Sequence, residues 1–505
     1  MLISSKNHNL ARILRVIRNP NTARFSSSMR EMDTQSEIER IVRLINEHPF
    51  PDRPLHPTLH SQIPQSALSA PFVEKILGNL FGAHSNGLKA YELFKYCLKS
   101  DQYTPSPGAF EKTLHILTRM RYFDKAWELI YKIKRAHPSL LTLKSMSILL
   151  SRIAKFKSYE ETLEAFERLQ NDVFPHKKFG TNEFNVLLRA FCTQRQMKEA
   201  RSIFHKMHSR FPPDTKTMNI LLLGFKESGD VTTVELFYHE MVRRGFVPNN
   251  VTYSIRIDAF CKKGHFGDSL RLLDEMERKG CGPTLETMTT LIHGAGLCRN
   301  VTKAKNLFFD EIPKRNLKAD TGAYNALLSS FIRSRDLCSA VKLMDEMEKE
   351  KIEHDDVTYH SMFSGFIRVD SVEGVCTLYR KMIGKNFVPK ARTAVMLMKF
   401  LCENRRVDLG LDLWRYLVGK GQCPHGHALE LLVTGLCACG RVEEAFLCCK
   451  QMLERGRVVS ERVVLMMERV LGEVGELGRF EELKGLIDKL KKILPPPKQY
   501  VIESS

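Results

Sequence analysis

The stretch TKTMNILLLGFKESGDVTTVELFYHEMVRRGFVPN (residues 215–249) decides the fold, because it recurs without a gap as NVTYSIRIDAFCKKGHFGDSLRLLDEMERKGCGPT (250–284). A third version, TGAYNALLSSFIRSRDLCSAVKLMDEMEKEKIEHD, occupies residues 321–355. Self-similarity at a fixed spacing of about 20–50 residues indicates a repeat array. Continued outward in both directions, the register predicts twelve units over residues 71–495: 71–106, 107–142, 143–180, 181–214, 215–249, 250–284, 285–320, 321–355, 356–390, 391–425, 426–460 and 461–495.

Each unit is predicted to form two helices. The first helix has apolar residues at helical spacing and a small residue at the tenth place of the unit, such as Gly224, Ala259 or Gly294. In the second helix a small residue recurs at the twentieth place and Met at the twenty-seventh, and Pro then ends several units. One helix pair cannot bury both of its apolar faces, so neighbouring pairs must stack. The predicted fold is all-α: an α-solenoid superhelix of about twelve helix-turn-helix repeats of about 35 residues, with a long concave surface.

Four segments of the units resemble the pentatricopeptide repeat: NVTYSIRIDAFCKKG (250–264), NEFNVLLRAFC (182–192), DVTYHSMFSGFIR (356–368) and ELFYHEMVRRGFVPN (235–249). The tetratricopeptide repeat has a similar length, but its Trp, Leu-Gly and Tyr signature is absent. The nearly uniform unit length resembles the P-type class of the family, which is typical of plant organelles. This resemblance implies that the concave surface binds single-stranded RNA, with one base facing each unit.

The resemblance also implies that the fifth and last residues of a unit recognise its base. On this pattern Asn185 with Asp214 implies uracil, and Asn219 with Asn249 implies a pyrimidine, with cytosine favoured. The remaining pairs, their bases and the base-clamping residues at the second place are as follows: Ser254 with Thr284 (purine), Thr289 with Asp320 (guanine), Asn325 with Asp355 (uracil), and Val251 and Val357 as clamps. The alternative interpretation is that these Asn and Asp residues are ordinary helix caps and turn residues.

The first thirty residues differ from the array in composition. They contain six Lys and Arg residues and no acid, and the segment has the amphipathic, Arg-rich pattern of an organelle-import peptide. We interpret residues 1–30 as a mitochondrial transit peptide, with a chloroplast as the alternative destination and a basic tail that binds nucleic acid as the alternative function. Residues 31–70 are predicted to form a short helix, ending near His48, and a Pro-rich linker, and residues 496–505 a short tail.

The charge of the chain favours a polyanionic partner. Its formal net charge is +19, of which the six cations of the first thirty residues account for less than half. No stretch is apolar over the 18 residues that a membrane span needs. Thirteen cysteines are scattered, without the short spacing of a secreted disulfide framework.

No enzyme signature accompanies the repeats. The zinc-deaminase signature of editing proteins, His-x-Glu with Pro-Cys-x-x-Cys, does not occur, nor does a phosphate-cradling Gly motif. One segment, 423–449, is rich in Cys and His, but several of its cysteines stand at places of the unit that face the core, so a structural role is preferred to zinc binding. We therefore predict no catalytic residues, no metal and no cofactor.

Together these features predict a non-enzymatic, sequence-specific binder of single-stranded organellar RNA in mitochondria. It would act in the processing, stabilisation, splicing or translation of organellar transcripts, together with other RNA-processing or ribosomal proteins. The alternative is a protein-binding helical scaffold, for example a subunit associated with the mitochondrial ribosome, that uses the same concave surface.

Overall fold

The computed structural model describes residues 36–50 and 53–492 of the chain, and all regular structure in these residues is helical. The predicted transit peptide (1–30) and the predicted tail (496–505) lie outside the described residues. None of the described helices is both long and apolar enough to cross a membrane.

From Ala70 to Lys491, within the described residues, twelve helix pairs follow one another, as predicted for an α-solenoid. The first helices of the pairs are α4 (Ala70–Gly82), α6 (Pro107–Arg119), α8 (Leu143–Phe156), α10 (Thr181–Cys192), α12 (Thr215–Ser228), α14 (Asn250–Lys262), α16 (Leu285–Leu297), α19 (Thr321–Arg333), α21 (Asp356–Arg368), α23 (Ala391–Glu403), α25 (Gly426–Ala438) and α27 (Glu461–Glu473). The second helices are α5 (Gly87–Cys97), α7 (Phe123–Ala136), α9 (Tyr159–Arg168) with η3 (Leu169–Val173), α11 (Met197–Met207), α13 (Val231–Arg243), α15 (Phe266–Arg278), α17 (Val301–Asn306) with η4 (Leu307–Glu311) and α18 (Ile312–Lys314), α20 (Leu337–Lys349), α22 (Val372–Gly384), α24 (Val407–Gly419), α26 (Val442–Glu454) and α28 (Leu477–Lys491).

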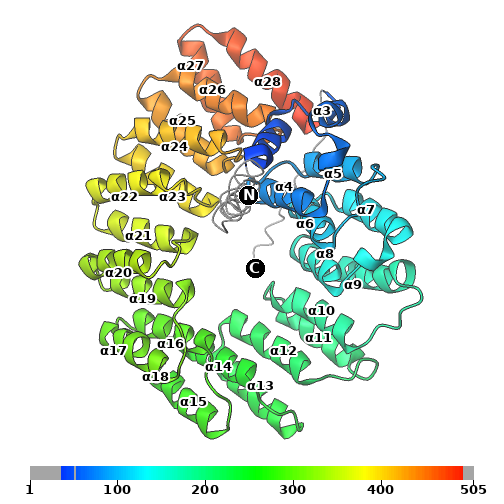
Figure 1. Ribbon diagram of the computed structural model, residues 1–505, viewed down its shortest axis with the longest axis vertical. Helices are drawn as coiled ribbons and strands as arrows, with labels where there is room; N and C mark the ends of the chain where they lie inside the picture. The colour runs from blue at the N-terminus through cyan, green and yellow to red at the C-terminus, as the bar shows by residue number, and fades with distance from the viewer. Residues whose placement is uncertain (1–35, 51–52, 493–505) are drawn as a thin grey trace, which may run out of the picture.

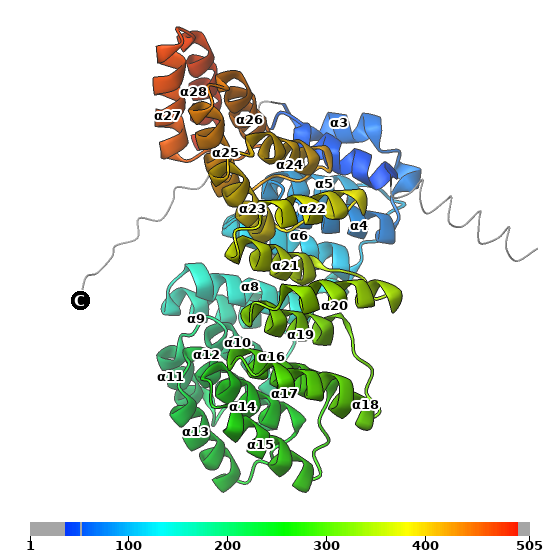
Figure 2. The same cartoon turned by 90° about the vertical axis from the view of Figure 1, so that its left-hand side faces the viewer.

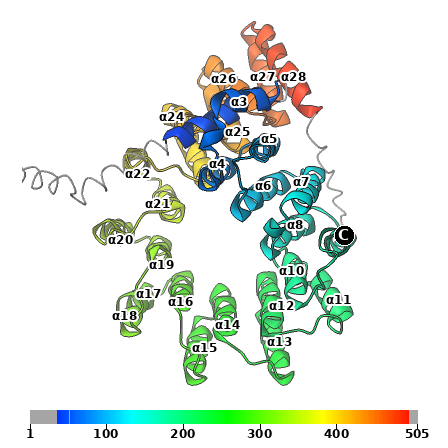
Figure 3. The ribbon, with the colours of Figure 1, turned by 45° about the vertical axis from the view of Figure 1, so that its right-hand side comes forward.

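The pairs form two layers that curve into a ring (Figure 1). Through the middle of the array the first helices, such as α10, α12, α14 and α16, form the inner layer, and the second helices form the outer layer (Figures 1 and 3). Consecutive first helices contact one another far more extensively than consecutive second helices do. The tighter inner layer bends the stack toward its first helices, which therefore line the concave surface.

Consecutive first helices approach closely through one repeated contact. The residue at the twelfth place of one unit packs against the small residue at the tenth place of the next, as Cys192 does on Gly224 and Cys261 on Gly294. A Cβ atom on Gly294 would lie 2.7 Å from the Cβ of Cys261, which is too close for any side chain. The cysteines at the twelfth place are therefore packing residues, and burial raises the pKa of Cys192 to about 12 and that of Cys261 to about 11.

We expect Gly294→Ala to destabilise the array by about 1–3 kcal/mol, because the added methyl overpacks the contact with Cys261. Gly485→Ala is the control, since Gly485 lies within α28 and a Cβ there meets no atom within 4 Å. The control should stabilise the protein by about 0.5–1 kcal/mol, as Ala does in a helix interior. Urea unfolding of the two variants measures both effects; a stabilising Gly294→Ala would contradict the close approach.

The turn between the two helices of a unit requires a left-handed residue at the fifteenth place. Gly264 has φ +81° and Gly440 has φ +72° at this place, and both suit it because they lack a Cβ. Arg195, Arg299 and Arg405 occupy it with φ between 56° and 62°, a conformation that costs a residue with a side chain about 1 kcal/mol or more. The repeat geometry thus overrides the local preference of these arginines.

The predicted Pro-rich linker is wrong, because residues 55–62 form a helix of the core. This helix, α3 (Leu55–Gln62), buries Leu55 and Leu59, and Ile63 behind it is also buried. Its prolines stand where a helix tolerates them: Pro54 precedes the first residue, Pro57 lies in the first turn and Pro64 follows the end. The short helix before it spans residues 36–47, within the predicted segment.

The two ends of the array meet at a seam. Figures 1, 2 and 3 show helices α3 to α5 beside α24 to α26. At the seam the backbone N–H of Cys423 donates to the carbonyl of Ala83 at 2.8 Å, and Asn46 Nδ2 donates to the carbonyl of Gly421 at 2.6 Å. Arg455 forms an ion pair with Glu47 at 3.3 Å. The helix of residues 36–47 and the turn after α4 thus contact loops of the tenth and eleventh pairs, and one superhelical turn closes on the next.

A buried lysine supports the seam from α5. Lys89 is fully buried, and its Nζ donates to the backbone carbonyl of Asn46 at 2.8 Å. Burial lowers the pKa of Lys89 to about 7.

We expect Lys89→Met to change how stability depends on pH. The unfolded chain keeps the Lys89 proton up to about pH 10, whereas the folded protein loses it above about pH 7, so unfolding takes up a proton in this window. The free energy of unfolding of the wild type should therefore rise relative to that of Lys89→Met between pH 7 and pH 9.5, by on the order of 1–3 kcal/mol. Lys95→Met, on the partly exposed side of the same helix, is the control. Curves for Lys89→Met and wild type that run parallel across this range in urea titrations would contradict the assignment.

Candidate functional site

The last residue of a unit is the N-cap of the next unit's first helix. Its backbone is extended, and its side chain accepts a hydrogen bond from the first turn of that helix. This holds for all five units predicted to recognise a base, at Asp214 before α12, Asn249 before α14, Thr284 before α16, Asp320 before α19 and Asp355 before α21. The interpretation of these residues as helix caps is thus shown, and it does not exclude a second role because all five are exposed.

The asparagine at the fifth place of a unit is bonded to the cap that ends the same unit. Asn325 Nδ2 donates to Asp355 Oδ1 at 3.0 Å, and Asn219 Nδ2 donates to Asn249 Oδ1 at 3.2 Å. Asn185 Nδ2 donates to Asp214 Oδ1 at 3.3 Å. The structure therefore brings together three of the five predicted pairs by a direct bond.

These asparagines are buried, although they were predicted to face bases on the concave surface. Asn185 is 2% exposed, Asn219 7% and Asn325 6%. Each amide lies beneath its cap, and the cap covers it from solvent. The exposed partner of each pair is the cap residue.

A threonine at the third place of the unit, which was not predicted, joins most of these pairs. Thr358 Oγ1 donates to Asn325 Oδ1 at 2.7 Å, and Thr252 Oγ1 donates to Asn219 Oδ1 at 2.8 Å. Thr287 Oγ1 bonds to Ser254 Oγ at 3.0 Å and to Thr284 Oγ1 at 3.1 Å, so it connects the fourth pair indirectly. The signal was present, since Thr recurs at this place and is fully buried each time, at 217, 252, 287, 358 and 393.

In the caps Asp355 and Asn249, one side-chain atom is held by hydrogen bonds, and the other, the outer atom, is not. Asp355 Oδ1 accepts from the Thr358 backbone N–H at 2.9 Å as well as from Asn325, while Oδ2 takes part in none of the hydrogen bonds of the described residues. In Asn249 it is again Oδ1 that accepts, from the backbone N–H groups of Val251 and Thr252. The outer atom is therefore an acceptor, Oδ2, at Asp355 but a donor, Nδ2, at Asn249.

Two of the predicted pairs differ from this arrangement. Thr217 gives its hydroxyl to Asp214, at 2.7 Å, so the carbonyl oxygen of Asn185 is buried without a partner. Although partial burial raises the pKa of Asp214, hydrogen bonds from Thr217 and Asn185 outweigh it and leave this pKa below its usual value. Asp320 caps α19 by accepting from the Ala323 N–H at 2.9 Å, and no hydrogen bond joins it to Thr289 among the described residues.

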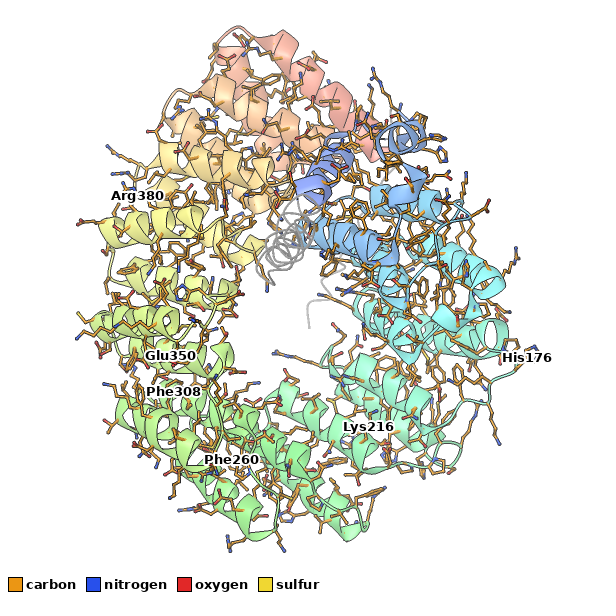
Figure 4. The ribbon with its side chains drawn as sticks, in the orientation of Figure 1. His176, Lys216, Phe260, Phe308, Glu350 and Arg380 are labelled. Carbon is orange, nitrogen blue, oxygen red and sulfur yellow. The ribbon has the colours of Figure 1, made fainter. Side chains whose placement is uncertain are left out.

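The predicted clamp residues flank the caps on the surface. Val251 is 56% exposed and Val357 51%, both in the first turn of an inner helix. The corresponding residue of α12 is Lys216, which is also exposed (Figure 4). With all side chains of the described residues drawn, the ring still surrounds an opening, while His176 and Arg380 lie on its outer side (Figure 4). The surface around each cap is thus accessible and carries an apolar or cationic neighbour.

The Cys- and His-rich segment does not assemble into a cluster. Cys448 and Cys449 are buried in α26, and burial raises the pKa of Cys448 to about 12. Cys423 is buried at the seam, and Cys439 is exposed. Within the described ranges no three His, Cys, Asp or Glu side chains are placed to share a metal ion.

Comparison with known proteins agrees with this architecture. The PPR repeat family model matches residues 183–227, 213–262, 256–299 and 319–368, and the PPR repeat model matches 357–387 and 431–457. The pentatricopeptide repeat-containing protein At3g61360 of Arabidopsis thaliana is 56% identical over 465 residues, which cover 92% of this chain and 93% of that protein. The chain belongs to the pentatricopeptide repeat family.

More distant members match parts of the chain. The putative pentatricopeptide repeat-containing protein At1g02420 of Arabidopsis thaliana is 34% identical over 41% of each chain. The mitochondrial pentatricopeptide repeat-containing protein At5g15010 of the same plant is 26% identical over 43% of this chain and 38% of its own. Among solved structures, the pentatricopeptide repeat protein PPR10 from maize has 17% identity and a TM-score of 0.30 over 91% of this chain and 84% of its own. The same protein in complex with an 18-nucleotide psaJ RNA element has 14% identity and a TM-score of 0.29 over 97% of this chain and 99% of its own.

The contribution of the Asp355 cap to stability can be measured with two substitutions. We expect Asp355→Ala to lower the free energy of unfolding by about 1 kcal/mol or slightly more, because α21 loses its cap and Asn325 its partner. Asp355→Asn should change it by less than about 0.5 kcal/mol, since Asn caps as well as Asp and the chain itself uses Asn at residue 249. Urea unfolding of both variants tests this; equal losses would show that the charge, and not the cap, matters.

Proposed function

We propose that this pentatricopeptide repeat protein binds single-stranded RNA along its inner layer, with the caps between consecutive units selecting the bases. The observation that carries the proposal is the repeated cap arrangement. At Asp214, Asn249 and Asp355 the helix N-terminus and the buried asparagine hold one side-chain atom, Oδ1, in place. The second atom is left on the concave surface, where it can meet a base edge.

The chemistry of the outer atom explains why Asp and Asn should select different bases. Uracil carries a proton on its central ring nitrogen, so it needs an acceptor, and Asp355 offers the carboxylate oxygen Oδ2. Cytosine has no proton at that nitrogen, so it needs a donor, and Asn249 offers its amide Nδ2. Because the bonds to Oδ1 fix the orientation of each cap, the outer atom is preorganised and loses little entropy on binding.

Flanking groups support the same proposal. The exposed Val251 and Val357 can cover the faces of bases that lie between consecutive units. The last turns of several inner helices carry cations, and three of them, Arg189, Arg333 and Arg368, are exposed and form no ion pair among the described residues. Such cations can contact phosphates and would make binding weaken with added salt.

We place this activity in an organelle, and in mitochondria before chloroplasts. The support is the acid-free, Arg-rich composition of residues 1–30 and the word mitochondrial in the names of several relatives. Occupancy of a transcript by the array would protect it, hold it open for translation or present it for splicing or processing. No catalytic group is needed for any of these outcomes.

A base-swap experiment tests the proposal. The predicted bases for units 181–214 to 321–355 are matched by a single-stranded RNA that contains U-C-A-G-U, read from 5′ to 3′. We expect wild type to bind this RNA about tenfold more tightly than the version with C at the last position, and Asp355→Asn to reverse this preference. Fluorescence anisotropy at two salt concentrations measures the affinities.

Asn249→Asp is the matched control for that experiment. It makes the opposite chemical change three units before that of Asp355, so it should shift the preference at the second base from C to U and leave the last base unaffected. If Asp355→Asn alters the affinity for both RNAs equally, the cap does not select the base. If neither RNA binds and the protein co-purifies in a salt-stable protein complex, the scaffold function replaces the proposed one.

A further inference from the structure

The seam forms an open cavity of about 550 Å³ to which none of the base-recognition units contributes. It lies between the turns that follow α4 and α6 on one side and the loops that precede α25 and follow α26 on the other. Its lining residues are His84, Asn86, Arg119, Met120, Tyr122, His425, Gly426, Met452, Gly456, Arg457 and Val458. This set contains two arginines and two histidines but no carboxylate, and the cavity volume suits a small ligand.

The guanidinium of Arg119 is incompletely bonded. Its Nη1 donates to the carbonyl of Phe81 at 2.8 Å, and the group lies over the Phe81 ring, 4.4 Å from the centroid. Its Nε and Nη2 are shielded from solvent and have no hydrogen-bond partner. Arg457, on the opposite wall, forms no ion pair among the described residues. Two arginines from different superhelical turns therefore share a cavity without an anion to balance them.

The excess of positive charge lowers the pKa values of neighbouring groups. Burial, together with Arg119, Arg457 and His425, lowers the pKa of His84 to about 4. Burial and the adjacent Arg457 and Arg152 lower the pKa of Arg119 to about 10. Asn86 holds the cavity wall in place, since its Nδ2 donates across the seam to the carbonyl of Gly456 at 3.3 Å. A bound anion would relieve the repulsion and add contacts to both sides of the seam.

We propose that this cavity binds a phosphate group, held between Arg119 and Arg457. The guanidinium fork matches the geometry of phosphate oxygens, and the two arginines of the lining give the cavity a positive charge that no carboxylate of the lining offsets. Asn86 and Tyr122 line the same cavity and can donate to further oxygens. Because Arg119 ends α6 and Arg457 follows α26, one phosphate bridges two turns of the superhelix and stabilises the closed ring. The site does not depend on base recognition by the caps.

The first test is a calorimetric titration of the full chain with inorganic phosphate at constant ionic strength. We expect one site in the wild type and an affinity at least about tenfold lower in Arg457→Gln, which corresponds to the loss of one charge-assisted bond. Arg271→Gln is the control, since Arg271 is a highly exposed residue of α15 that pairs only with Asp268 and lies away from the seam. It should bind phosphate as the wild type does. Phosphate binding that is absent in the wild type, or equal in wild type and Arg457→Gln, overturns the proposal.

A second variant distinguishes a loss of phosphate binding from a loss of folding. Arg457→Lys keeps the charge but lacks the fork, so it should bind phosphate with an intermediate affinity while its circular dichroism and melting temperature match those of the wild type. If Arg457→Lys and Arg457→Gln bind equally weakly and both have lost helicity, the comparison is repeated with Arg119→Lys from the other wall. A fully folded Arg119→Lys with unchanged phosphate affinity also overturns the proposal.

The source of the phosphate is resolved with three probes: uridine monophosphate and a uridine hexanucleotide with or without a 5′-phosphate. A hexanucleotide that binds the wild type more tightly with the 5′-phosphate, but not Arg457→Gln, identifies an RNA end as the occupant. An equal loss for both hexanucleotides in Arg457→Gln identifies an internal RNA phosphate, and a loss for the mononucleotide alone identifies a free nucleotide. Asp355→Asn should leave the binding of inorganic phosphate unchanged, so that failure of this site and failure of base recognition are distinguishable.

Discussion

The close approach of consecutive first helices is the constraint on which the rest of the structure depends. A residue of one helix, such as Cys261, occupies the space that a side chain on the next helix would fill, and Gly294 leaves that space open. The contact recurs from unit to unit and draws the inner layer together, while the outer helices stay further apart. The curvature of the ring and the position of its concave surface both follow from this difference between the layers.

The same approach creates the candidate site. It brings the first turn of one inner helix within hydrogen-bond distance of the first turn of its neighbour, so Asn325 can reach Asp355 and Thr358 can reach Asn325. A helix cap, which would otherwise serve its own helix alone, becomes a link between two units. Folding and recognition therefore use one set of atoms: the bonds that orient the cap are also the bonds that leave its outer atom on the surface.

The seam adds a contact that a linear stack of repeats lacks. In a solenoid each unit touches only its neighbours, so stability is close to a sum of local terms. Here Asn46 and Asn86 connect the beginning of the chain to loops more than three hundred residues later, and Lys89 holds Asn46 from α5. Cations lie close to these contacts, Lys89 and Arg119 among them, so the seam combines long-range closure with an excess of positive charge that a ligand can neutralise.

Much of the fold could be predicted because its signal is local and repeated. The helix pairs follow from a 35-residue period that is visible in residues 215–284 alone. The exception is α3, where the number of prolines suggested a linker but their positions at the ends of the helix allow it to form. The left-handed backbone conformation of arginines such as Arg299 was also not predicted, since only the geometry of the turn imposes it on them.

The positions of the site residues in the repeat could be predicted, but the hydrogen bonds between them could not. The repeat, the places of the caps and the identity of the outer atom follow from the sequence, because they depend on residues within one unit. The burial of the asparagines beneath the caps, the threonine that links them and the meeting of the two ends of the array are known from the structure alone. These features depend on distances between units or between turns of the superhelix. Packing fixes these distances, and they do not appear as a periodic pattern in the sequence.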